Sequence, residues 1–162
     1  MCGRAYLLLQ RKLPGLHLVL VCGPRIAPES LHVPTGIDVR GFVPDLYKHL
    51  AAADLAVVQG GGTTTLELTA LRRPFIYFPL EGHCEQQVTV AGRLARQRAG
   101  VKMAFPATTP ASLADAITRH LAAAVSYPPY RSAARTGWRT SSSGMPEPPQ
   151  QARRAGLPRS PG

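Results

Sequence analysis

A run of three glycines and three threonines, at residues 60–65, is the first feature of this sequence that suggests chemistry. It follows the apolar residues 54–59 and leads into a predicted helix. Glycines pack no side chain and cost backbone entropy, so three in succession suggest that a ligand approaches the main chain closely. The free N–H groups and the dipole of a helix N-terminus favour an anion, and threonine hydroxyls are further donors. The pattern indicates a phosphate-binding turn.

A second group of polar side chains follows the next apolar run, at residues 75–80. Glu85, Gln86 and Gln87 begin a predicted helix there. Ligands of open parallel sheets bind beyond the carboxyl ends of the strands, so we expect this group beside the glycine turn. Carboxylates such as that of Glu67 accept hydrogen bonds from ribose hydroxyls, and amides both donate to and accept from sugar hydroxyls. The two groups together favour a ligand that combines phosphate with sugar.

Glu67 also has a second interpretation. Thr64 and Glu67 match the capping box T-x-x-E, in which the carboxylate would accept only from the first amides of its own helix. By itself this pattern favours a helix cap, and Gln86 and Gln87 by themselves would be a solvated first turn. The glycine run is neither a GxGxxG fingerprint nor a Walker loop, which disfavours redox dinucleotides and ATP hydrolysis. The histidines and cysteines lack metal-ligand spacing, so we expect no metal site.

Alternating strands and helices must position these groups. Short apolar, β-branched or alternating runs predict strands at residues 17–23, 37–43, 54–59, 75–80 and 101–105. Apolar spacing, together with Pro and Gly at the ends, predicts helices at residues 5–13, 46–53, 63–73, 85–100 and 110–124. This alternation predicts an α/β domain with an open parallel sheet and helices on both faces.

Composition changes abruptly near residue 127. Residues 1–126 carry the alternating pattern, and residues 127–162 are rich in Pro, Arg and Ser with few aliphatic residues. We expect residues 127–162 to be a disordered tail, since such a segment buries little apolar surface. Its six arginines and one acid supply half of the net charge of +10, so the charge does not indicate nucleic acid as a partner.

Apolar stretches, the first residues and the cysteines indicate where in the cell the protein is expected. No apolar stretch reaches the roughly 18 residues that cross a bilayer, and the first residues do not resemble a signal peptide. The three cysteines are widely separated and odd in number, which disfavours a disulfide framework. We expect a cytoplasmic protein without a transmembrane segment.

The glycine turn, the apolar runs beside it and the polar group at residues 85–87 resemble the C-terminal, donor-binding domain of GT-B type glycosyltransferases. The blocks at residues 54–67, 73–79 and 85–91 carry the resemblance, which extends over about residues 5–125. The chain is most similar to the glycosyltransferase family 28 C-terminal domain, typified by the bacterial enzyme that adds N-acetylglucosamine to lipid-linked muramyl-pentapeptide. It is more distantly similar to macrolide and plant secondary-product glycosyltransferases. The resemblance implies half of a GT-B, Rossmann-like fold that lacks its first strand.

The resemblance assigns one part of the donor to the glycine turn. Gly61, Gly62, Thr63 and Thr64 are expected to face the diphosphate of a UDP- or dTDP-sugar, the donor substrate. No cofactor is expected beyond this donor. Plant-type members carry a histidine where Gln59 stands, so that phosphate contact is missing here.

The resemblance assigns the other parts of the donor to three further segments. Glu67 is expected to hold the ribose hydroxyls, and Gln86 and Gln87 are expected to contact the transferred sugar. Phe42 and Val43 are expected to border the nucleotide base.

The implied activity is hexosyl transfer from a nucleotide-diphosphate sugar to an acceptor hydroxyl, with this chain as the donor-binding half. No residue is assigned as the catalytic base. The alternatives are a donor-binding subunit or an inactive fragment that needs a separate acceptor-binding chain, and a sugar-nucleotide epimerase of the same architecture. The expected partners are the nucleotide-sugar, an acceptor-binding domain or chain, and a membrane surface as a peripheral contact.

Overall fold

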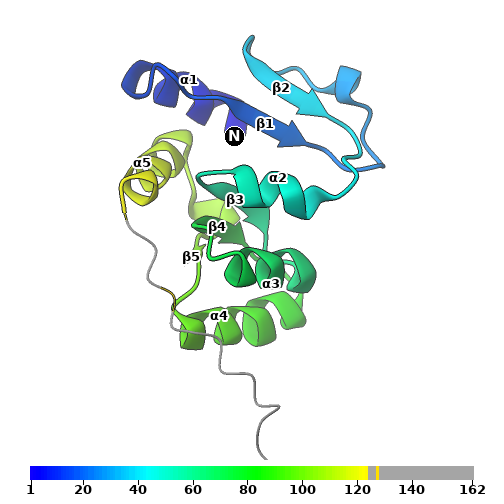
Figure 1. Cartoon of the computed structure of the whole chain (residues 1–162), viewed down its shortest axis with the longest axis vertical. Helices are drawn as coiled ribbons and strands as arrows, with labels where there is room; N and C mark the ends of the chain where they lie inside the picture. The colour runs from blue at the N-terminus through cyan, green and yellow to red at the C-terminus, as the bar shows by residue number, and fades with distance from the viewer. Residues whose placement is uncertain (124–126, 128–162) are drawn as a thin grey trace, which may run out of the picture. The chain divides into compact units, whose positions relative to one another are not determined.

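The computed structural model describes residues 1–123 and Tyr127, in which helices alternate with parallel strands (Figure 1). The strands are β1 (Leu18–Val21), β2 (Ile37–Arg40), β3 (Ala56–Gln59), β4 (Phe75–Phe78) and β5 (Val101–Lys102). The α-helices are α1 (Cys2–Lys12), α2 (Leu46–Ala52), α3 (Gly62–Ala70), α4 (Ala91–Gln97) and α5 (Pro110–Leu121). Short 3₁₀ turns form at Pro28–Ser30 and Phe105–Ala107, and a π-helix at Glu85–Val90. The predicted alternation is confirmed.

The strands form two parallel sheets in the part of the chain that the structure describes. In one sheet β1 pairs with β2, and Leu18 lies opposite Ile37. The other sheet has the order β3-β4-β5, with Ala56 opposite Phe75. No residue of β1 or β2 is buried, whereas three of the four residues of β4 are. Parallel strands are normally covered on both faces, and β4 has such burial whereas β1 and β2 do not.

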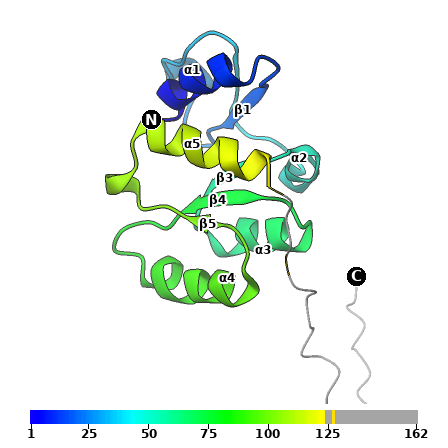
Figure 2. The same cartoon turned by 90° about the vertical axis from the view of Figure 1, so that its left-hand side faces the viewer.

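Helices cover both faces of the β3-β4-β5 sheet, as predicted. Successive side chains of a strand point to opposite faces, so β4 contributes to two apolar clusters. Ile76 packs with residues of α1 and α5, while Phe75 and Tyr77 pack with Leu68 of α3 and Leu94 of α4. Figure 2 shows α5 on one side of this sheet and α3 with α4 on the other.

Tyr127 belongs to the folded core rather than to the predicted tail. Its side chain is 9% exposed, and its hydroxyl donates to the carbonyl oxygen of Arg73 at 2.8 Å. Its carbonyl accepts from Nη2 of Arg72 at 3.2 Å, and its ring packs edge-on against Phe75. Burial raises the pKa of the Tyr127 phenol. The rest of the predicted tail lies outside the described residues.

The first glycine of the turn lies where the ends of β3 and β4 meet. The amide of Gly60 donates to the carbonyl of Phe78 at 2.8 Å, and a Cβ added at Gly60 would lie 2.9 Å from Cα of Pro79. A Cβ added at Gly61 would meet nothing within 4 Å. Gly60 is therefore required by packing, whereas packing within the described chain does not explain the glycine at position 61.

Replacing Tyr127 tests whether the fold extends to this residue. Tyr127→Ala should lower the free energy of unfolding by about 3 kcal/mol through loss of the buried ring, and Tyr127→Phe by about 1 kcal/mol through loss of the hydroxyl hydrogen bond. Urea unfolding followed by circular dichroism measures both. Tyr47→Ala, which removes an exposed tyrosine of α2, is the control and should change stability little. Wild-type stability in Tyr127→Ala would contradict this packing.

The same substitution at the two glycine positions should destabilise the protein by different amounts. Gly60→Ala should cost about 1–3 kcal/mol, because its methyl group meets the backbone of Pro79. Gly61→Ala should cost less than about 1 kcal/mol, since the added methyl group enters open space. Urea midpoints of the two variants measure the difference, and equal midpoints would show that the approach of β3 to β4 is not the constraint.

Candidate functional site

Three backbone amides at the start of α3 have no acceptor within the described part of the chain. Gly61 is the N-cap residue of α3, and no side chain caps this end of the helix. The amide of Gly61 donates to Gln59 and that of Thr65 to Gly61, whereas the amides of Gly62, Thr63 and Thr64 make no hydrogen bond there. Free amides at a helix N-terminus, together with its dipole, bind anions.

Glu67 does not cap this helix, so the capping-box interpretation is wrong. Helix α3 begins at Gly62, which makes Thr64 the third residue of the helix instead of its cap. The Glu67 carboxylate is partly exposed and makes no hydrogen bond or ion pair with another described residue. It lies one helical turn after Thr63, on the same face of α3. This carboxylate is therefore free to accept hydrogen bonds from a ligand.

Gln86 and Gln87 hold the loop that follows β4. Oε1 of Gln86 accepts from the amide of Leu80 at 2.9 Å. Nε2 of Gln87 donates to the carbonyl oxygens of Leu80 at 3.0 Å and Pro79 at 3.3 Å. These bonds leave the NH2 group of Gln86 and the side-chain oxygen of Gln87 without partners in the described chain. Each amide can thus fix the loop and still contact a ligand.

The predicted helix at residues 85–100 differs in its first part. Residues Glu85–Val90 form a π-helix, and the α-helical part, α4, starts only at Ala91. Isolated π-helical turns within helices are frequent at functional sites. The turn places Oε1 of Glu85 3.8 Å from the position that a Cβ on Gly62 would take. The structure thus brings the polar group after β4 beside the glycine turn, as the sequence predicts.

Phe42 and Val43 lie on a different part of the domain. They follow β2, which belongs to the separate β1-β2 sheet. The Phe42 side chain is 71% exposed, whereas Val43 is 9% exposed. No hydrogen bond between described residues joins them to α3. Their expected role beside a nucleotide base stays a prediction.

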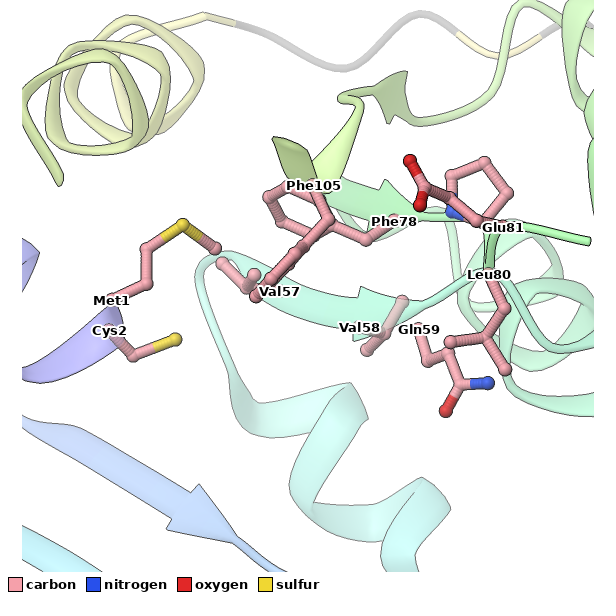
Figure 3. Close-up of a pocket in the computed structure, with 10 residues that line it drawn as sticks. Met1, Cys2, Val57, Val58, Gln59, Phe78, Leu80, Glu81 and Phe105 are labelled. Carbon is pink, nitrogen blue, oxygen red and sulfur yellow. The ribbon is translucent and has the colours of Figure 1, made fainter. Parts of the chain in front are cut away.

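An apolar pocket of about 480 Å³ adjoins the glycine turn. Its walls come from Met1 and Cys2 at the start of α1, from β3, from the end of β4 and its loop, and from Phe105. Figure 3 shows Gln59 and Leu80 at one end of the pocket and Met1 at the other. Because its lining is mainly apolar, this pocket does not suit a diphosphate. The free amides at the start of α3 suit a diphosphate better.

Thr65 acts differently from the prediction that the threonine hydroxyls donate to an anion, because its hydroxyl donates to the backbone. Arg93 was not predicted to take part in the site at all. Thr65 is fully buried, and its hydroxyl donates to the carbonyl oxygen of Gly61 at 2.7 Å. Arg93 of α4 donates from Nη2 to the Thr65 hydroxyl at 2.9 Å. The only signal in the sequence is that Arg93 lies seven residues, or about two helical turns, after Gln86.

The described residues offer neither a metal-binding cluster nor a membrane-spanning helix. Residues 1–123 and Tyr127 contain no group of three or more His, Cys, Asp or Glu side chains that could hold a metal ion. None of the helices among these residues has the length and apolar character needed to cross a membrane.

Comparison with known proteins places the chain in a family. The model of the glycosyltransferase family 28 C-terminal domain matches residues 7–139. A Rhodopseudomonas palustris protein, UDP-N-acetylglucosamine–N-acetylmuramyl-(pentapeptide) pyrophosphoryl-undecaprenol N-acetylglucosamine transferase, is 40% identical over 82 residues. The match covers 50% of this chain and 22% of that protein. The chain thus spans about a fifth of the length of the curated relatives it matches.

Solved structures show the same fold. The glycotransferase of kitacinnamycin has a TM-score of 0.59 and 22% identity, and the match covers 74% of this chain and 30% of that one. Spinosyn rhamnosyltransferase complexed with thymidine diphosphate has a TM-score of 0.55 and 24% identity, and the match covers 73% of this chain and 31% of that one. The predicted half of a GT-B, Rossmann-like fold is confirmed. The chain belongs to the glycosyltransferase family 28 C-terminal domain family.

Proposed function

We propose that this chain is the donor-binding half of a glycosyltransferase that moves a hexosyl group from a UDP- or dTDP-sugar to an acceptor hydroxyl. The observation that carries the proposal is the uncapped start of α3. Three free amides lie there in succession, at Gly62, Thr63 and Thr64, and the space beside Gly61 is open. A diphosphate supplies the acceptor oxygens that these amides lack.

The other polar groups suit the rest of such a donor. The unpaired carboxylate of Glu67 lies one turn along α3, within the reach expected for the ribose next to the diphosphate. The free amide atoms of Gln86 and Gln87 lie across the turn, on the side of the loop after β4. In this arrangement they contact the transferred sugar. Val43 and the exposed ring of Phe42 border the base.

The chemistry of this half is electrostatic. In transfer, the acceptor oxygen attacks the anomeric carbon while the bond from that carbon to the diphosphate oxygen breaks. Negative charge then grows on the leaving diphosphate. Fixed amides and a helix dipole stabilise such charge, and can do so without a metal ion. The base that takes the proton of the acceptor hydroxyl belongs, in this proposal, to an acceptor-binding domain or chain.

The names of two related proteins support the choice of donor. The Rhodopseudomonas palustris relative is named for UDP-N-acetylglucosamine, and the spinosyn enzyme was solved with thymidine diphosphate. Uracil and thymine nucleotides are therefore the first donors to test. Because the chain spans about a fifth of its curated relatives, a donor-binding subunit that works with a separate acceptor-binding chain is the second candidate.

Calorimetric titration with UDP and dTDP tests the proposed site. Wild-type protein should bind at least one of them saturably. Glu67→Ala should weaken binding by about 10- to 100-fold, the effect of losing hydrogen bonds to a charged group. Asp115→Asn removes a carboxylate from an exposed position on α5 and should leave affinity unchanged. Equal affinity of Glu67→Ala and wild type, with both folded, would contradict the ribose contact.

A comparison of UDP with a UDP-hexose tests the sugar contact separately. Gln86→Ala should weaken binding of the UDP-hexose several-fold and leave UDP affinity within about twofold, because only the hexose meets the amide. Equal losses for both ligands would mean that Gln86 acts through the loop at Leu80. Sugar transfer by the purified chain alone would contradict its assignment as a donor-binding half.

A further inference from the structure

The side chain of Arg93 crosses from α4 to the first turn of α3. Its Nη2 donates to the hydroxyl oxygen of Thr65 at 2.9 Å and to the carbonyl oxygen of Gly62 at 3.3 Å. Its Nε is buried and has no partner among the described residues. Arg93 makes no ion pair within this part of the chain. Its described contacts are therefore directed at the glycine turn rather than at an acidic side chain.

Thr65 connects Arg93 to the carbonyl oxygen of Gly61. Thr65 is fully buried, and its hydroxyl donates to the carbonyl oxygen of Gly61 at 2.7 Å and lies 3.1 Å from that of Gly62. The same hydroxyl accepts from Nη2 of Arg93. Because the hydroxyl has one proton, acceptance from Arg93 leaves that proton for the backbone. The carbonyl oxygens of Gly61 and Gly62 are thus both held, one through Thr65 and one directly by Arg93.

Holding these two carbonyls also fixes two amides. A peptide unit is planar, so the direction of a carbonyl sets the direction of the N–H group of the next residue. The carbonyl of Gly61 shares its plane with the amide of Gly62, and that of Gly62 with the amide of Thr63. Both amides are among the three free donors at the start of α3.

The charge of Arg93 is also placed where helix stability alone would not favour it. The N-terminus of a helix is its positive end, so a cation there is unfavourable for the isolated helix. An anion bound at the same end reverses this effect, because it is attracted both by the helix and by the guanidinium. The position of Arg93 is thus better explained by a bound anion than by helix stability.

We infer that Arg93 is a positioning residue, which holds the glycine turn so that the amides of Gly62 and Thr63 point at the donor diphosphate. The inference rests on the proposed function. It also links the two halves of the site, because Arg93 follows the π-helix that carries Gln86 and Gln87. One side chain then keeps the diphosphate-binding turn in register with the sugar-binding segment.

The test compares three variants of α4 in their affinity for UDP and for uridine. Arg93→Met should weaken UDP binding about tenfold, the effect of losing hydrogen bonds from a charged donor, and leave uridine binding unchanged. Arg93→Lys keeps the charge but not the planar fork, and should lose nearly as much. Arg96→Met removes the same charge from an exposed position on the same helix and should stay within twofold of wild type.

A second measurement does not depend on nucleotide binding. Hydrogen–deuterium exchange of the ligand-free protein should be several-fold faster at the amides of Thr65 and Leu66 in Arg93→Met than in wild type or Arg96→Met, because the first turn of α3 loosens. If the wild type binds no UDP, the proposed function fails. Faster exchange would then still show that Arg93 holds the turn.

Three results would overturn the inference. One is UDP affinity in Arg93→Met equal to that of wild type. Another is full recovery by Arg93→Lys, which would assign the effect to charge alone. The third is unchanged exchange at Thr65 and Leu66 in Arg93→Met, which would show that Arg93 does not hold the turn.

Discussion

The close approach of β3 to β4 at Gly60 is the constraint on which the site depends. No side chain fits between Gly60 and Pro79, so the main chain of β3 reaches the end of β4 and turns there into α3. This contact sets the glycine turn against the loop that Gln86 and Gln87 hold through hydrogen bonds to Leu80. Functional groups of an α/β sheet gather at the carboxyl ends of its strands. Here the backbone contact between Gly60 and Pro79 brings two such strand ends together.

At the start of α3, side chains bind the carbonyl oxygens of the first turn, whereas the first amides have no acceptor among the described residues. A helix N-terminus is normally capped by Ser, Thr, Asp or Asn, and glycine in their place costs roughly a few tenths of a kcal/mol. Here the cap position is Gly61, while Thr65 and Arg93 bind the carbonyl oxygens behind it. The first amides of α3 thus stay free while the carbonyl oxygens of the same turn are held.

Much of the fold could be predicted from the sequence, and the exceptions have physical causes. The runs at 54–59 and 75–80 are apolar and β-branched enough to predict β3 and β4, and the glycines locate the turn. The capping box failed because α3 begins at Gly62, so that Thr64 is already helical. The polar surroundings of Tyr127 hid its burial, and the contact of Arg93 depends on the packing of α4 against α3, which no local pattern encodes.

The most direct test is to follow the backbone amides of ¹⁵N-labelled protein by NMR during titration with UDP. We predict that the amides of Gly62, Thr63 and Thr64 shift together and saturate at one UDP per chain, because these three free donors gain an acceptor. Saturable binding that shifts the amides of residues of the apolar pocket, such as Cys2 and Phe105, and leaves these three amides unchanged would contradict it.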